Sequence, residues 1–118
     1  MQVIATKITQ NPAIVKFELD EIIVRTENFE FKNIDETQNS PLAKQLFFLP
    51  FVKTVYISGN FIAIEKFSIV EWEDVQEDVA NQINEFISNG GIIIQVDENK
   101  TKKQPITVYA ETTPNPSV

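Results

Sequence analysis

Residues 52–66, VKTVYISGNFIAIEK, constrain the fold of this chain more than any other stretch. Two runs rich in β-branched and aromatic residues flank Gly59 and Asn60, a pair that favours a two-residue hairpin turn. The register set by such a turn places aliphatic side chains opposite one another on one face, Ile57 with Ile62 and Val55 with Ile64. Tyr56 and Ala63 then lie on the other face. Turn chemistry and residue pattern therefore predict the same hairpin.

Further strands are predicted before and after this hairpin. Residues 2–9 and 13–19 are β-rich and are separated at Asn11 and Pro12, where the proline cannot donate a ladder hydrogen bond. The second run alternates apolar and charged residues, as half-buried strands do: Val15, Lys16, Phe17, Glu18 and Leu19. The remaining candidates are an interrupted third strand over 22–26 and 29–32, and a short edge strand over 92–96.

Two segments carry helix signals. Ser40 can cap a helix that begins at Pro41, and Pro50 ends that helix after about two turns. Its apolar side consists of Leu42, Leu46 and Leu49. The main helix is predicted over 71–88, because apolar residues recur there at spacings of three and four. These residues are Val75, Val79, Ile83 and either Phe86 or Ile87, with Trp72 one turn earlier.

Composition narrows the possible functions. The 118 residues match one domain in length, and 42% of them are hydrophobic, enough for a single core. The net charge of −7 argues against binding to nucleic acids or anionic membranes, which attract Lys and Arg. The chain has no Cys and no His, which excludes thiolate and imidazole catalysis and the usual zinc and iron–sulfur ligands. Since no targeting signal is evident, we expect a cytoplasmic protein.

The predicted main helix is strongly acidic. It carries carboxylates and no basic residue: Glu71, Glu73, Asp74, Glu77, Asp78 and Glu85. Paired carboxylates can hold a cation or perform acid–base chemistry, but a solvated helix face more often explains such a run. A Ser40–Lys44 dyad stays open from sequence, although capping and surface charge explain both residues better. We therefore predict no enzyme activity and no catalytic, cofactor-binding or metal-binding residue in this chain.

A short repeat occurs near the end of the chain. When Asn115-Pro116 is aligned with Asn11-Pro12, Thr113 falls on Thr9. The preceding run, DENKTKKQ, is charged, contains no core residue and is typical of a linker. We therefore predict a domain over 1–96, a linker over 97–105, and over 106–118 the first strand of a second copy. A chance Pro-rich tail is the alternative.

Several blocks of the sequence resemble the N-terminal domain of Nfu-type (NifU-like) iron–sulfur cluster scaffold and carrier proteins. They are TQNPAIVKFEL, SPLAKQLFFLPFVKTVYISGNFIAIEK, and the Trp72-led helix ending in INEFISNG. Two residues depart from the family pattern: Gln10 stands for a Pro, and Phe51 for a residue that is more often Gly. The resemblance implies an α+β fold with two layers, an antiparallel sheet of about four strands and two helices packed on one face.

The resemblance also implies a function. In such proteins a separate CxxC domain binds a [4Fe–4S] cluster, so this fragment is expected to be an accessory domain without a cofactor. Its expected partners are apo iron–sulfur proteins or assembly factors, with no nucleic acid and no membrane. The alternative is a structural spacer or self-association domain without client contact.

Two groups of residues are candidate partner contacts. One is an apolar patch beside a basic residue, consisting of Lys44, Phe47, Phe48 and Phe51. The other is the turn that contains Thr9, Asn11 and Pro12. Burial in the core is the alternative for each Phe, and a simple strand break is the alternative for the turn.

Overall fold

The predicted hairpin forms the centre of the fold. The structure is a computed structural model that describes residues 1–95. Strands β4 (Val52–Ser58) and β5 (Phe61–Lys66) pair antiparallel, with Ile57 opposite Ile62 and Val55 opposite Ile64, which confirms the predicted register. Gly59 has φ +53°, in the left-handed region that glycine adopts without strain. The sequence therefore predicted both the turn and its consequence for side-chain direction.

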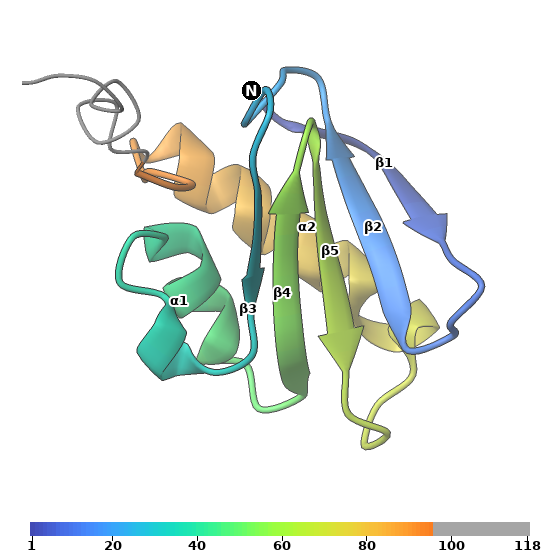
Figure 1. Ribbon diagram of the computed structural model, residues 1–118. Helices are drawn as coiled ribbons and strands as arrows, with labels where there is room; N and C mark the ends of the chain where they lie inside the picture. The colour runs from blue at the N-terminus through green and yellow to red at the C-terminus, as the bar shows by residue number, and fades with distance from the viewer. Residues whose placement is uncertain (96–118) are drawn as a thin grey trace, which may run out of the picture.

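Three more strands extend the hairpin into a twisted antiparallel sheet with the order β1-β2-β5-β4-β3 (Figure 1). They are β1 (Val3–Ile8), β2 (Ile14–Leu19) and β3 (Asn28–Phe31). The sheet thus has five strands where about four were predicted. The α+β, two-layer class is confirmed.

Two predicted strand segments are not strands, because their backbone groups bond elsewhere. In the 22–26 segment, the Ile23 and Val24 N–H groups both donate to the Gly59 carbonyl, so this segment folds over the hairpin turn. After the last helix, the Ile93 carbonyl accepts from Ser40 Oγ at 2.7 Å, and the Gln95 N–H donates to Asn39 O. The described part of 92–96 is therefore bonded to the start of a helix and not to a sheet edge.

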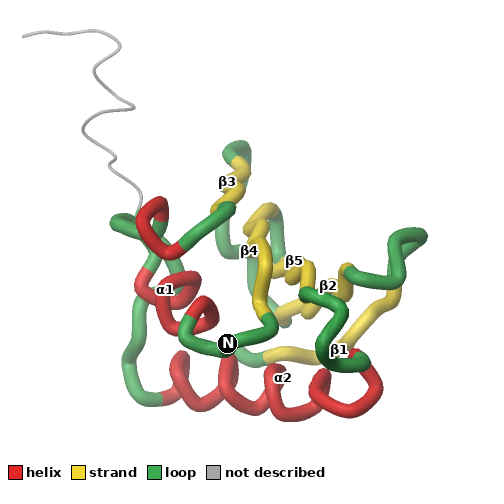
Figure 2. The backbone as a smooth tube through the Cα atoms, turned by 90° about the horizontal axis from the view of Figure 1, so that it is seen from below, coloured by secondary structure: helices red, strands yellow, loops and turns green. Residues whose placement is uncertain are grey.

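Both helices, α1 (Pro41–Phe47) and α2 (Trp72–Ser88), lie on the same side of the sheet (Figure 2). Ser40 caps α1 as predicted, since its Oγ accepts a hydrogen bond from the Ala43 N–H at 3.1 Å. Glu71 precedes α2 as its N-cap residue, so the helix begins one residue later than predicted. Between β3 and α1 lies one short 3-10 turn, Ile34–Glu36.

The core fills the space between the sheet and the two helices. Its largest fully buried apolar side chains come from five elements: Val15, Phe17 and Leu19 of β2, Leu42 and Leu46 of α1, Val55 and Ile57 of β4, Ile62 and Ile64 of β5, and Val79 and Ile83 of α2. The opposite face of the sheet carries Tyr56 and Phe61, whose ring centroids lie 6.1 Å apart. Lys16 Nζ lies 4.4 Å from the Phe61 ring centroid on this face. Within residues 1–95, neither helix is long and apolar enough to cross a membrane.

Candidate interaction surface at one end of the sheet

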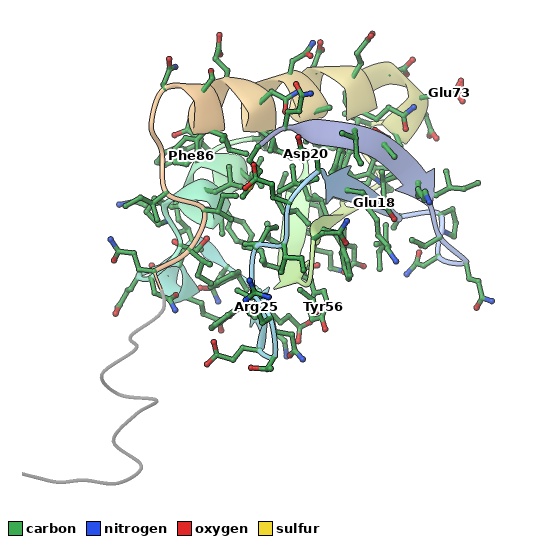
Figure 3. All side chains as sticks on the ribbon, turned by 90° about the horizontal axis from the view of Figure 1, so that it is seen from above. Glu18, Asp20, Arg25, Tyr56, Glu73 and Phe86 are labelled. Carbon is green, nitrogen blue, oxygen red and sulfur yellow. The ribbon has the colours of Figure 1, made fainter. Side chains whose placement is uncertain are left out.

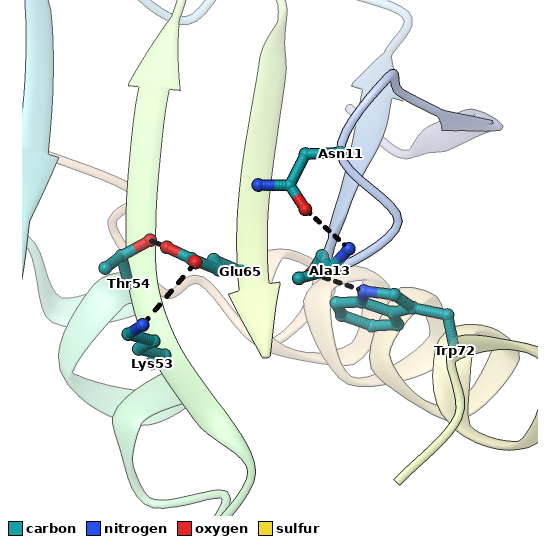
Figure 4. Close-up of polar contacts among 6 residues, drawn as sticks. All are labelled: Asn11, Ala13, Lys53, Thr54, Glu65 and Trp72. Carbon is teal, nitrogen blue, oxygen red and sulfur yellow. Dashed lines mark hydrogen bonds and ion pairs between the residues drawn. The ribbon is translucent and has the colours of Figure 1, made fainter. Parts of the chain in front are cut away.

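Three connections meet at the end of the sheet opposite the Gly59 turn, and we call them together the loop end: residues 9–13, 48–51 and 67–71. They are joined by hydrogen bonds. The Ala13 carbonyl accepts from Trp72 Nε1 at 2.8 Å, as Figure 4 shows, and from the Lys66 N–H at 3.0 Å. The Phe67 N–H donates to the Phe51 carbonyl at 2.8 Å. These hydrogen bonds therefore hold the three connections of the loop end together.

Trp72 is the side chain around which the loop end is organised. Its indole is buried and packs edge-to-face on two rings, with centroid distances of 5.9 Å to Phe17 and 6.3 Å to Phe51. Such aromatic pairs stabilise a fold beyond the area they bury. One residue at the start of α2 thus fixes the first turn of the chain, the sheet and the connection before β4 together.

The turn predicted as a contact builds its own geometry. Thr9 Oγ1 lies 2.9 Å from the Asn11 carbonyl and 3.0 Å from the Ile14 carbonyl, and it accepts from the Asn11 N–H. Asn11 Oδ1 accepts from the Ala13 N–H at 2.9 Å (Figure 4). Pro12 is exposed at the tip of the turn. Thr9 and Asn11 therefore shape this loop, and partner contact by them and by Pro12 stays a prediction.

The predicted apolar patch is divided by the fold. Phe48 is 62% exposed, and Lys44 is exposed one helical turn before it on the outer side of α1. Phe47 is half-buried and packs against the core. Phe51 is 9% exposed. The expectation that Phe51 adds an exposed contact is wrong, because its ring packs on Trp72.

Sequence reasoning missed two exposed apolar residues of the loop end. Phe67 is 46% exposed and Ile69 is 67% exposed, and both lie in the connection between β5 and α2. The signal was present in the sequence, since the four residues FSIV connect a complete hairpin strand directly to a helix. Only Val70 of this segment packs against the core. Phe67 and Ile69, with Phe48, give the loop end three exposed apolar side chains.

The acidic run predicted for the main helix lies along the solvent side of α2. All six carboxylates are exposed, and Figure 3 shows Glu73 pointing away from the sheet near the start of the helix. None of them forms an ion pair within the described residues. Residues 1–95 also contain no group of three acidic side chains arranged to hold a metal ion. The acids therefore form a negatively charged surface on the solvent side of α2.

A cavity lies at the opposite end of the sheet. It is a cavity of about 560 Å³, open to solvent, between β1, the 20–25 connection and the Gly59 turn. Exposed Ile4 and Ile22 line it together with the charged residues Asp20, Glu21 and Arg25. Asp20 is already bonded, since its Oδ1 accepts from the Gln2 N–H at 3.0 Å. Glu21 is paired as well, with its Oε2 3.4 Å from the N-terminal ammonium, so both carboxylates of this cavity stabilise the fold.

Comparison with known proteins agrees with this architecture. The family model described as the N-terminal part of the scaffold protein Nfu/NifU matches residues 4–90, well over half of the chain. This chain belongs to the Nfu/NifU N-terminal family.

Some curated relatives of this Nfu N-terminal domain are named as iron–sulfur cluster scaffold homologs, and others as NifU-like proteins. The chain is 32% identical over 88 residues to the mitochondrial NFU1 iron-sulfur cluster scaffold homolog of Drosophila willistoni, which covers 74% of this chain and 30% of that protein. It is 31% identical over 88 residues to the protein of the same name from Homo sapiens, covering 74% and 35%. The chain therefore spans about a third of the length of these relatives.

Solved structures show the same fold. A solution structure of a NifU-like protein from Saccharomyces cerevisiae superposes with a TM-score of 0.69 at 24% identity, covering 81% of this chain and 87% of that one. The crystal structure of protein SAV1430 from Staphylococcus aureus gives a TM-score of 0.61 at 22% identity, covering 70% and 99%. At these identities the likeness concerns the fold alone.

Proposed function

We propose that this Nfu N-terminal domain is a non-catalytic accessory module of an iron–sulfur cluster scaffold or carrier protein. It contacts apo iron–sulfur proteins or their assembly factors and aids cluster delivery to them. The cluster is cargo of the whole protein, and a [4Fe–4S] cluster would be held by a separate CxxC domain, since this chain contains no Cys. A cytoplasmic location stays a prediction, and several of the relatives are named mitochondrial.

The observation that carries this proposal is the loop end. Phe48, Phe67 and Ile69 are exposed on connections that hydrogen bonds and the Trp72 indole hold in place. Exposed apolar side chains on a fixed backbone lose little conformational entropy when a partner binds. A surface of this kind suits the recognition of another protein better than it suits chemistry on a small molecule.

The second domain copy remains a proposal, since residues 106–118 lie outside the described residues, as does the predicted linker 97–105. The turn of the first copy supports it. The recurring residues Thr113, Asn115 and Pro116 correspond to Thr9, Asn11 and Pro12, and the first two of these shape that turn. The residue between them, Gln10, forms no side-chain hydrogen bond within residues 1–95, so its replacement by Pro114 leaves the pattern intact.

The test uses the full-length protein in which this domain and the predicted CxxC domain would occur together. Cluster loading and cluster transfer to apo-acceptor proteins are compared with and without residues 1–104, and then between the intact protein and its Phe48→Ser variant. We expect unchanged loading and weaker transfer or acceptor binding in both cases. Unchanged loading and transfer would support the spacer alternative, and a tight dimer of this domain in sedimentation would support self-association.

A further inference from the structure

The apolar residues of the loop end lie directly beside the acidic beginning of α2. Ile69 precedes Glu71 by two residues, and Glu73 and Asp74 complete the first turn. The helix dipole favours negative charge at this position, which gives these carboxylates a structural explanation. Glu77 and Asp78 stand one turn further on, where the dipole contributes little.

The acids of the second turn, Glu77 and Asp78, destabilise the helix by charge repulsion. Glu77 follows Glu73 by four residues, and Asp78 follows Asp74 by four, so each pair brings like charges together on the surface. No basic residue of α2 compensates them, because the helix contains no Lys or Arg. A positive group placed between these turns would relieve the repulsion, and within residues 1–95 no ion pair supplies one.

Basic residues elsewhere at this end do not balance the acids. Lys53 Nζ is 3.7 Å from Glu65 Oε2 and is thus already paired, as Figure 4 shows. Lys66 is half-buried and Lys44 is exposed, and neither forms an ion pair within the described residues, so two lysines stand against five carboxylates, Glu71, Glu73, Asp74, Glu77 and Asp78. Negative charge is therefore in excess around Phe67 and Ile69.

We propose that the loop end binds a polypeptide segment that presents apolar side chains together with Lys or Arg. The apolar side chains pack on Phe48, Phe67 and Ile69, and the basic groups pair with the acids of the first two turns of α2. This inference rests on the proposed function and names the chemistry of the partner. A second copy of this domain does not fit the same surface, because it would bring the same excess of acid and repel.

The test measures binding of a synthetic peptide of alternating lysine and leucine to the complete 118-residue chain by fluorescence anisotropy. A peptide with glutamate in place of lysine serves as its negative counterpart. We expect the basic peptide to bind and the acidic peptide not to bind. We also expect the double variant Glu73→Gln, Glu77→Gln to weaken binding roughly three- to tenfold, the effect of losing two exposed ion pairs.

A matched control separates this site from general attraction to an acidic protein. The double variant Glu30→Gln, Glu85→Gln removes the same charge from β3 and from the far end of α2, about 18 Å of helix from Glu73 at 1.5 Å per residue. At physiological salt that separation exceeds the screening length, so we expect a change below about twofold. Equal weakening by both double variants would overturn the proposal.

A second pair of variants tests the contribution of the apolar side chains to peptide binding. Ile69→Ser at the loop end should weaken peptide binding roughly fivefold or more, the value of one apolar side chain packed on a partner. Ile22→Ser, at an isoleucine of the opposite end that is also more than half exposed, should leave binding unchanged. Equal effects of the two variants would overturn the proposal.

The two levels of inference can fail separately. If neither peptide binds while Phe48→Ser still weakens cluster transfer, the partner chemistry is wrong and the proposed function stands. If the basic peptide binds with the expected pattern while transfer is unaffected by Phe48→Ser and by removal of residues 1–104, the surface is real and the proposed function is wrong.

Discussion

The two ends of the sheet hold their connections by different means. At the loop end a buried indole packs on Phe17 and Phe51 and bonds the Ala13 carbonyl. At the other end backbone geometry does this work, since the Gly59 carbonyl accepts from two N–H groups of the 20–25 connection. Packing fixes one end and turn geometry fixes the other. As a result, the exposed apolar side chains of the loop end lie on a backbone that the packing of Trp72 holds in place.

The largest effect is expected from Trp72→Ala. The substitution removes both aromatic contacts and the hydrogen bond to Ala13, so we expect the free energy of unfolding to fall by about 3–5 kcal/mol, the usual cost of truncating a buried aromatic. Urea unfolding measures this loss. Trp72→Phe keeps a ring but no donor and should cost clearly less. Equal losses for the two variants would show that the indole N–H, and not packing, holds this end.

A smaller effect is expected from Gly59→Ala at the other end. A new Cβ would meet no atom within 4 Å, so the cost comes only from the left-handed backbone, φ +53°. We expect a loss of about 1–2 kcal/mol in the free energy of unfolding. A loss as large as that of Trp72→Ala would mean that packing also governs the hairpin end, contrary to the comparison.

Asn11→Ala sharpens the comparison within the loop end. The amide oxygen bonds the Ala13 N–H in an exposed turn, so its removal should destabilise the fold by about 0.5–1 kcal/mol, as expected for one hydrogen bond. Asn28→Ala is the control, because Asn28 lies opposite Ser58 at the hairpin end, is exposed, and has no side-chain hydrogen bond within residues 1–95. Thermal unfolding of the two variants should therefore separate them.

The smallest effect on stability is expected from Phe48→Ser and Ile22→Ser. Both side chains are more than half exposed, so each substitution should change the free energy of unfolding by less than about 0.5 kcal/mol. Phe48→Ser should nevertheless weaken partner binding, whereas Ile22→Ser should not. A marked loss of stability for Phe48→Ser would indicate that Phe48 belongs to the fold and would remove it from the proposed surface.

Several residues of the candidate surface were predicted from the sequence, but which of them are exposed was not. Phe48 and the Thr9–Pro12 turn were predicted as two separate surfaces, and the structure brings the turn and the segment that follows Phe48 to the same end, linked through Trp72. Phe51 was predicted as a contact residue, but it is buried. Local pattern cannot tell which of several neighbouring phenylalanines packs on a tryptophan that lies far along the chain, as Phe51 packs on Trp72.

The sequence by itself determined the local elements of this domain. Turn chemistry at Gly59, capping by Ser40 and alternation in β2 act over a few residues, and each was correct because the relevant interactions are short-range. Tertiary structure alone decided the fate of the segments 22–26 and 92–95 and the burial of Phe51. In each case the segment or side chain interacts with a group far away in the sequence: the Gly59 carbonyl, the Ser40 hydroxyl and the Trp72 ring, respectively. A segment of weak local preference adopts whichever structure satisfies its backbone and apolar groups, and only the folded chain brings those partners within reach.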